Sequence, residues 1–419
     1  MLAGTLQTWM TRRLSVRQRL ERVCTSSLLF LMVVTTKHSL EQAARFSGLH
    51  KSLFSKMLQS HAKVAIATLE SLSTTQARQF SKVLQRVNGL PWKIVIIIDS
   101  TLQHRASLHP ENAKTFNHGK GYVIGHQWTN IVLILGDMLI PLRPIPFYSK
   151  RYCQAHDLAY QSEHERVVAY LRTLDLEDYI GVYDRREVLV LADSGYDDKK
   201  IEKAIAAKGW HFIIALSKTR SVKSEALALS TPTSRQWCHI DTFFRRHRRL
   251  KWDTMRLATH GNTRKRMDVR IRHTSGYLRY VGKVELVCSE WRHRPDGRRK
   301  YLACNDLRAT ARQIVTAYRM RWAVELFHKC VKQHLGFEDV ATHGFDAVMS
   351  HVHWVYCAYI LLHMSPPGLS PGAQSIGDKQ RALQQGLADQ EKRHILQKLT
   401  QIGGVQRYKD ELRQALAGT

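Results

Sequence analysis

Acidic residues are scarce in this 419-residue chain: 35 Asp and Glu stand against 64 Lys and Arg, which gives a formal net charge of +29 at pH 7. That excess is far larger than solubility requires, and it favours a polyanion as the partner. Hydrophobic residues still make up 44% of the chain, enough to bury at least one large core and to form two to four domains. The composition therefore excludes a disordered basic tail.

Paired cysteines are also absent. The seven cysteines are scattered along the chain and no C-x-x-C pair occurs. This spacing argues against a zinc ribbon and against a disulfide framework. It is typical of a protein that works in a reducing cytoplasm.

The sequence has no apolar run that predicts a membrane span. The segment "VCTSSLLFLMVV" at 23–34 follows a basic stretch, as the core of a secretory signal would. It is too short to span a bilayer as a helix, and no small-residue cleavage site follows it. A second apolar stretch, 345–364, is interrupted by Asp346 and three histidines. Both segments are predicted to be buried helices, and no membrane partner is expected.

The first 90 residues have helical periodicity and lack strand signals. Within them, 38–60 predicts two short helices joined at Gly48, with Ser39 as the first N-cap and with Leu53, Phe54 and Met57 facing inward. This is the spacing of a helix-turn-helix DNA-binding unit. Because any two-helix corner that contains a glycine has the same pattern, plain packing remains the alternative.

Strand signals begin abruptly at residue 93. "KIVIIIDS" (93–100) and "REVLVLADS" (186–194) are continuous β-branched and aliphatic runs, typical of strands buried on both faces. Residues 130–145 predict a hairpin that turns at Gly136 and Asp137. Helices are expected near 156–173 and 197–207, followed by a strand at 211–217. This order predicts a mixed sheet flanked by helices, with three antiparallel strands first and parallel strands added after them.

Residues 218–304 break this alternation and predict an antiparallel sheet of their own. The segment is strongly basic, above all in "RRHRRLK" (245–251) and "RHRPDGRRK" (292–300), and three tryptophans lie among its cations: Trp237, Trp252 and Trp291. Cations interspersed with aromatic rings suit phosphates and base stacking. A solvated charged face is the alternative interpretation.

One predicted helix, 317–336, carries its polar residues in an unusual place. Tyr318, Arg321, Glu325 and Lys332 fall within an arc of about 60° on one side of it, while apolar residues occupy the opposite side. The two cations have no evident compensating acid in this segment. The face therefore predicts a site for something negatively charged.

Aspartates end two of the buried strands. Asp99 and Asp193 each stand where an apolar run gives way to a loop. Alone, each could be a turn former or a helix cap. Together with Glu325 they would form a set of three carboxylates at one edge of the sheet, an all-oxygen ligand set that suits Mg²⁺ or Mn²⁺ better than zinc. Two such ions about 4 Å apart could promote attack on a phosphodiester and stabilise its leaving oxygen.

These residues resemble a known family. The spacing Tyr318-x2-Arg321-x3-Glu325-x6-Lys332 is similar to the Y-R-E-K signature of bacterial insertion-sequence transposases of the IS-four type, which are DDE enzymes with an RNase H-like core. "IDST" around Asp99, "ADSGYDDK" around Asp193 and "ELFHKCVKQHLG" after the glutamate also resemble that family's three carboxylate neighbourhoods. The resemblance covers about residues 90–365, including a β-rich insertion before the glutamate.

The resemblance implies catalytic and metal-binding roles for Asp99, Asp193 and Glu325, with two divalent ions, Mg²⁺ or Mn²⁺, bound by them. It implies DNA-binding roles for Tyr318, Arg321, Lys329 and Lys332, and for a tryptophan that stacks on a flipped base; Trp291 is the candidate for that role. It also implies cut-and-paste transposition, with double-stranded DNA as the partner and a homodimer as the active complex, in the bacterial cytoplasm and at the nucleoid. Two alternatives stay open: an RNase H-like nuclease that only hydrolyses, and a DNA-binding regulator with a decayed site.

The predicted architecture is therefore α/β, with an RNase H-like mixed sheet flanked by helices, an inserted antiparallel β subdomain, and helical N- and C-terminal regions. The predicted boundaries are 1–90 for a helical DNA-binding region, 91–217 with 305–365 for the catalytic core, 218–304 for the basic insertion, and 366–419 for a linker and a helical tail.

Overall fold

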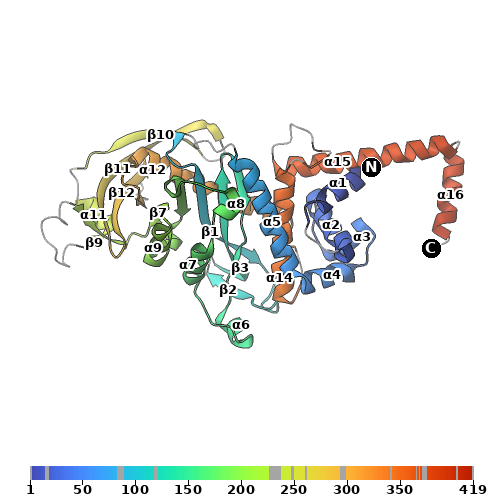
Figure 1. The fold of residues 1–419 in the computed structure, drawn as a ribbon, viewed down its shortest axis with the longest axis horizontal. Coiled ribbons are helices and arrows are strands. Elements are labelled where there is room, and N and C mark those ends of the chain that lie inside the picture. Colours follow the sequence, from blue (N-terminus) through green and yellow to red (C-terminus); the bar gives the residue numbers. More distant parts are fainter. Residues whose placement is uncertain are drawn as a thin grey trace. The chain divides into compact units, whose positions relative to one another are not determined.

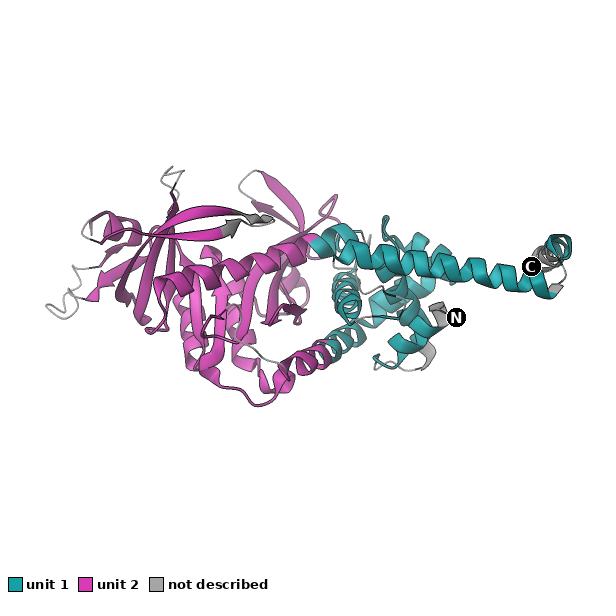
Figure 2. Cartoon of the chain, turned by 90° about the horizontal axis from the view of Figure 1, so that it is seen from above, with its two compact units in different colours: residues 1–72, 330–419 teal, residues 73–329 magenta. Residues whose placement is uncertain are grey.

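The computed structural model describes most of the chain, in the ranges 2–14, 18–82, 89–117, 121–225, 237–246, 250–259, 262–292, 299–339, 342–364, 366–367, 369, 375–402 and 404–417. The chain divides into two compact units, one formed by residues 1–72 and 330–419 and the other by residues 73–329 (Figure 2). The first is called unit 1 below and the second unit 2.

Unit 1 is helical, as the sequence predicts for its N-terminal and C-terminal segments. Its helices are α1 (Leu2–Thr11), α2 (Gln18–Val33), α3 (Leu40–Ser47), α4 (Lys51–Ser60), the first part of α5 (Ala62–Ser81), the end of α13 (Trp322–His334), α14 (Phe345–His363), α15 (Ile376–Ile402) and α16 (Val405–Ala417). Helix α14 is buried on all sides and packs against α2 and α4. The prediction that 345–364 is a core helix is confirmed. No helix among the described residues has both the length and the apolar character that a membrane crossing requires.

The two-helix corner of unit 1 forms as predicted. Ser39 caps α3 in a capping box, and Gly48 ends that helix with φ 68°, a left-handed conformation that glycine adopts without strain. Phe54 and Met57 on α4 are buried, each with 1% of its surface exposed. Leu53, predicted to face inward, is 41% exposed. That prediction is wrong because the buried face of α4 is formed by Phe54, Met57 and Leu58, and Leu53 falls outside it.

Unit 2 is built on one mixed sheet, in which the described residues form 13 strands (Figure 1). The strands are β1 (Ile94–His104), β2 (Lys114–Asn117), β3 (Tyr122–Leu135), β4 (Met138–Pro141), β5 (Ile145–Pro146), β6 (Val188–Ala192), β7 (His211–Leu216), β8 (Ser221–Ser224), β9 (Cys238–His239), β10 (Asp253–Thr259), β11 (Asn262–Leu278), β12 (Gly282–Trp291) and β13 (Lys300–Cys304). β1 pairs antiparallel with β3 and parallel with β6, and β6 pairs parallel with β7. The predicted mixed sheet is confirmed, including the β3–β4 hairpin that turns at 136–137.

The insertion does not form the separate sheet that the sequence pattern predicts. Its long strands are antiparallel, as expected, but β13 pairs with β7, so β13, β12 and β11 extend the central sheet. The prediction of an independent sheet is wrong because the pattern within the insertion does not indicate which strand outside it lies next to β13. Parts of its two basic clusters, 247–249 and 293–298, lie outside the described residues.

Helices cover the sheet of unit 2. They are α6 (Lys150–Ala155), α7 (Glu163–Thr173), α8 (Glu177–Ile180), α9 (Lys199–Ala207), α11 (Ile240–Arg246), α12 (Ala311–Tyr318) and the start of α13, with short 3-10 turns at Arg185–Glu187, Ser194–Tyr196 and Arg319–Arg321. α7 begins at 163 rather than near 156 because Ser162 caps it in a capping box.

The two faces of the central strands follow the alternation of side chains along a strand. Ile94, Ile96 and Ile98 of β1 belong to one apolar cluster, which also contains side chains of α7 and α9. Val95 and Ile97 are equally buried but must point to the opposite face. Asp99 continues this second series, so its carboxylate lies on the face opposite α7 and α9.

Candidate active site

Two neighbouring parallel strands place Asp99 and Asp193 side by side. Ile98 of β1 is paired with Ala192 of β6, and each aspartate is the next residue along its strand. Both therefore continue the same face of the sheet, on strands about 4.8 Å apart. Asp193 also begins the turn that follows β6, where its Oδ1 accepts a hydrogen bond of 2.9 Å from the backbone N–H of Gly195.

Arg321 joins the third carboxylate to the first. Its Nη1 lies 3.3 Å from Oδ2 of Asp99, and its Nη2 forms an ion pair with Oε1 of Glu325. Glu325 lies in the first turn of α13, where a negative charge is favoured by the helix dipole. Asp99, Arg321 and Glu325 are therefore joined by ion pairs.

The prediction that the cations of this segment lack compensating acids is wrong. Arg321 is neutralised by Asp99 and Glu325, and Lys332 forms an ion pair of 3.1 Å with Glu338. The spacing along the segment permits the Arg321–Glu325 pair but could not reveal the other two acids, because Asp99 is 222 residues away in the sequence and Glu338 lies beyond the end of the helix. The helix is also not uniform, since a 3-10 turn at Arg319–Arg321 separates α12 from α13.

A buried hydrogen bond fixes α13 against the sheet next to the carboxylates. Asn130 is the partner of Asp99 across the antiparallel β1–β3 pair. Its side-chain amide nitrogen lies 2.7 Å from Nε2 of His328, and both residues are buried. His328 follows Glu325 by three residues, so the two share one side of α13. Sequence reasoning missed this contact, because no local pattern links His328 to Asn130.

The carboxylates repel one another. Burial, together with the negative charges of Asp193 and Glu325, raises the pKa of the Asp99 carboxyl to about 7, although Arg321 acts in the opposite direction. A carboxyl group so shifted gains free energy when a cation approaches. This is the electrostatic character expected of a cation-binding site.

Lys300 is a second site residue that the sequence did not single out as such. It is the first residue of β13, and its ammonium lies 5.1 Å from the centre of the Tyr318 ring. Desolvation and the nearby Arg321 lower its pKa, against the opposing charges of Glu325 and Asp193. The sequence placed Lys300 in a basic cluster of the insertion; only the pairing of β13 with β7 brings it to the carboxylates.

The remaining predicted residues stand on α12, α13 and β12. Tyr318 ends α12 with 7% of its surface exposed, and burial raises the pKa of its phenol to about 12. Lys329 is exposed on α13, and Lys332 lies almost one turn further along that helix. Trp291 ends β12 and is 38% exposed, so it is not a core residue.

The donor set fits a hard divalent cation in its chemistry, since Asp99, Asp193 and Glu325 offer only carboxylate oxygens. Among the residues that the structure describes, however, no three acidic, histidine or cysteine side chains lie close enough together to hold an ion as they stand. The guanidinium of Arg321 contacts both Asp99 and Glu325 in this arrangement.

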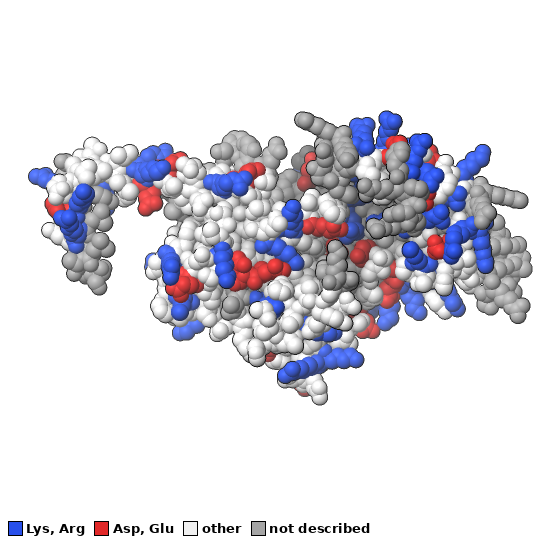
Figure 3. All heavy atoms as spheres, turned by 180° about the vertical axis from the view of Figure 1, so that it is seen from behind, with Lys and Arg blue, Asp and Glu red and all other residues white. Residues whose placement is uncertain are grey.

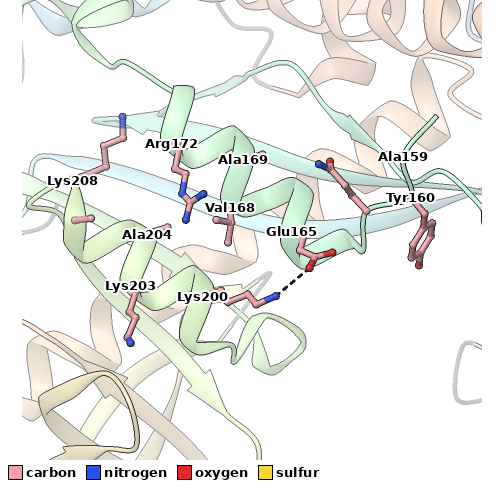
Figure 4. Close-up of a pocket in the computed structure, with 12 residues that line it drawn as sticks. Ala159, Tyr160, Glu165, Val168, Ala169, Arg172, Lys200, Lys203, Ala204 and Lys208 are labelled. Atoms are coloured by element: carbon pink, nitrogen blue, oxygen red, sulfur yellow. Dashed lines mark hydrogen bonds and ion pairs between the residues drawn. The ribbon is translucent and has the colours of Figure 1, made fainter. Parts of the chain in front are cut away.

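A hollow of about 950 Å³ lies elsewhere, between α7 and α9 (Figure 4). Val168 and Ala204 form part of its lining, and Glu165 forms an ion pair with Lys200 across it. These helices cover the face of the sheet opposite Asp99. The hollow is thus not part of the carboxylate site.

Comparison with known proteins gives one family. No curated protein sequence matches the chain significantly. The sequence profile described as "Transposase DDE domain" matches residues 92–361, a range that contains all three carboxylates and the strands and helices that carry them. Because this match covers more than half of the 419 residues, the chain belongs to the DDE transposase family.

Proposed function

We propose that the protein is a cut-and-paste transposase of the IS-four type, which cleaves DNA at the ends of an insertion sequence and joins the freed 3′-hydroxyl to target DNA. One observation carries the proposal: Asp99 and Asp193 follow paired residues on one face of the sheet, and Arg321 joins Glu325 to Asp99. The spacing from Tyr318 to Lys332 supports the IS-four assignment.

Asp99, Asp193 and Glu325 are the residues that would hold Mg²⁺ or Mn²⁺. When bound, two such ions supply activation of the attacking oxygen and stabilisation of the leaving oxygen. Arg321 would leave the carboxylates and bind a DNA phosphate next to the cleaved bond, with Tyr318 beside it. Lys300 would offer a further positive charge at the same place.

An assay of strand joining tests this function. The purified chain is incubated with Mg²⁺ and a fragment carrying the element's own end; we expect nicking of that end and, with a pre-cut end, covalent joining to a plasmid. Hydrolysis without joining would favour the nuclease alternative. Specific binding without either reaction would favour the decayed regulator.

Basic side chains of unit 2 favour DNA as the partner. Figure 3 shows Lys and Arg side chains gathered around the insertion, and the exposed ones include Arg245, Arg246, Lys251, Arg256, Arg266 and Arg292. Asp241 and Asp268 form ion pairs with three of these arginines, so the surface contains more acid than the sequence pattern suggested. The excess of cations remains suited to a phosphate backbone.

The domain boundaries predicted from the sequence are part of the proposal. Residues 1–90 would recognise the element end, with α4 as the helix that faces DNA, and a homodimer would hold two ends together. Electrophoretic mobility of the complex with one and with two end fragments measures whether two protomers and two ends combine.

Arg321 and the two lysines of α13 should bind phosphates. Replacing Arg321, Lys329 or Lys332 with Ala is expected to weaken binding of the cleaved end, and to reduce the slope of log K against log salt by about 0.9 for each lost phosphate contact. Fluorescence anisotropy at several salt concentrations measures this slope. Lys93→Ala is the matched control, because Lys93 pairs with Glu187 before the start of β1, away from the carboxylates. Unchanged slopes for all three variants would assign these residues a structural role.

Trp291 should stack on an extruded base. Because base stacking on an aromatic side chain contributes about 1–3 kcal/mol, Trp291→Ala is expected to slow processing of the second strand by about 5-fold to 150-fold, with little effect on the first nick. Separate assays of each strand measure this difference. Trp291→Phe, which keeps a ring, should retain most of the activity. Equal loss of both steps, or a large fall in melting temperature, would contradict the stacking role.

A further inference from the structure

Glu163, the first residue of α7, accepts hydrogen bonds from three sides. The Gln127 amide donates to its Oε2 over 2.7 Å, the Thr129 hydroxyl to its Oε1 over 2.8 Å, and the Tyr196 hydroxyl to the same Oε1 over 2.7 Å. Tyr196 is only 2% exposed. One carboxylate thus links α7, β3 and the turn that follows β6. Glu163 and its three donors are called the Glu163 hub below.

The hub lies directly behind the candidate site. Ser100 follows Asp99 in β1, and Thr129 is its partner on β3. Because successive side chains of a strand point to opposite faces, Ser100 and Thr129 face α7 while Asp99 faces α13. Glu163 is therefore on the wrong face of the sheet to touch DNA or an ion held by Asp99. Any effect it has on the reaction must pass through the residues that it positions.

The backbone pairing of β1 with β6 stops short of the two aspartates. The hydrogen-bonded pairing of β1 with β6 ends at Ile98 and Ala192, one residue before Asp99 and Asp193. Beyond that point the strands are free to separate unless side chains join them. The Glu163 hub makes this connection, because the Glu163 carboxylate accepts hydrogen bonds both from Thr129 of β3, which is paired with Ser100 of β1, and from Tyr196, which belongs to the turn that begins at Asp193.

His164, the next residue of α7, fixes the same turn. Its Nε2 lies 2.8 Å from the carbonyl oxygen of Gly195, and its Nδ1 lies 3.0 Å from Oδ2 of Asp198. The N–H of Gly195 in turn donates to the Asp193 carboxylate. The start of α7 thus contacts the Asp193 turn at Gly195, Tyr196 and Asp198.

We propose that Glu163 is a positioning residue that sets the distance between the Asp99 and Asp193 carboxylates, so that both can bind the same divalent ion. The proposal rests on the proposed function, since it assigns Glu163 a task in that same site. Partners that orient ligand side chains typically change metal affinity or activity by about 10-fold to 100-fold when they are removed. The Glu163 hub is expected to have an effect of this size.

Glu163→Gln tests the proposal, because it keeps the side-chain shape but removes the charge and half of the acceptor capacity. We expect Mn²⁺ affinity of the DNA-free protein, measured by isothermal titration calorimetry, to fall by about 10-fold. The rate of first-strand nicking at limiting Mn²⁺ should fall in parallel and should recover at high Mn²⁺, with end binding within 2-fold of wild type. Tyr196→Phe, which removes one donor to Glu163, should have a smaller effect in the same direction.

Glu165→Gln is the matched control. It makes the same change of charge two residues further along α7, where the side chain is exposed and where Gln also serves in a capping box. Unchanged Mn²⁺ affinity and nicking in folded Glu163→Gln would overturn the proposal. So would a lower melting temperature accompanied by a nicking defect that high Mn²⁺ does not restore, since that pattern indicates a purely structural role. If the wild-type chain neither binds Mn²⁺ nor nicks the end, it is the proposed function that fails.

Discussion

Alanine at Asp99, Asp193 or Glu325 is expected to lower strand cleavage by about 1,000-fold or more, while binding of the element end persists. The reason is that each carboxylate would serve the divalent ions, and the several kcal/mol of charge stabilisation that an ion supplies correspond to about three powers of ten in rate. Nicking of a labelled end fragment in Mg²⁺ and in Mn²⁺ measures the loss, and gel mobility measures binding.

The control for these variants is another acidic residue of the same sheet region. Glu187→Ala removes a carboxylate that pairs with Lys93 just before β6, so it should leave cleavage near the wild-type rate. If Asp99→Ala, Asp193→Ala or Glu325→Ala cleaves as fast as the wild type, that residue does not bind the ions. Loss of DNA binding together with cleavage would instead indicate that the variant disturbs the fold.

Stability should depend on pH through Asp99. Its pKa in the folded protein is raised to about 7, whereas in the unfolded chain it should be about 3.9. Between these values the folded state binds more protons than the unfolded state, so the free energy of unfolding falls as pH rises from about 4 to about 7 and is constant above. A shift of about three pKa units corresponds to at most about 4 kcal/mol.

Asp99→Asn should abolish this decline, because an amide does not ionise and Glu325 still pairs with Arg321. Without divalent ions, its melting temperature at pH 8 is therefore expected to exceed that of the wild type by several degrees. Adding Mg²⁺ should stabilise the wild type more at pH 8 than at pH 5, since the ions compete with the proton on Asp99. Calorimetry across pH with EDTA or Mg²⁺ measures both effects; equal pH profiles for the two proteins would show that Asp99 is not the titrating group.

Much of the fold could be read from local sequence patterns. The apolar runs of β1, β6 and β7 form strands that are buried on both faces. A strand buried in this way requires continuous hydrophobic residues, whichever strands pair with it. The β3–β4 turn was predictable because it contains a glycine between two apolar runs. Gly136 has φ 61°, a conformation that favours glycine. The edge pairing of the insertion was not, because the alternation of β13 fits any antiparallel neighbour and only the assembled sheet selects β7.

The positions of Asp99, Asp193 and Glu325 were likewise determined by the sequence. Each aspartate ends an apolar run, and the glutamate stands at a fixed spacing from Arg321. Parallel strands bring their ends to one edge, so the proximity of the aspartates follows from the strand order. That Arg321 lies between Asp99 and Glu325, rather than free for an anion, did not follow, because ion pairing across 222 residues depends on where α13 is packed.

What tertiary structure alone decided is how the carboxylates are supported. His328 contacts Asn130, and Glu163 accepts hydrogen bonds from Gln127, Thr129 and Tyr196. His328 and Tyr196 lie within segments that resemble the family, but no local pattern assigns them these partners. Buried polar groups require partners, and a partner distant in the sequence is set by strand register and helix packing. The sequence by itself therefore placed the two aspartates at the ends of neighbouring strands, whereas the packed sheet specified what holds their surroundings in place.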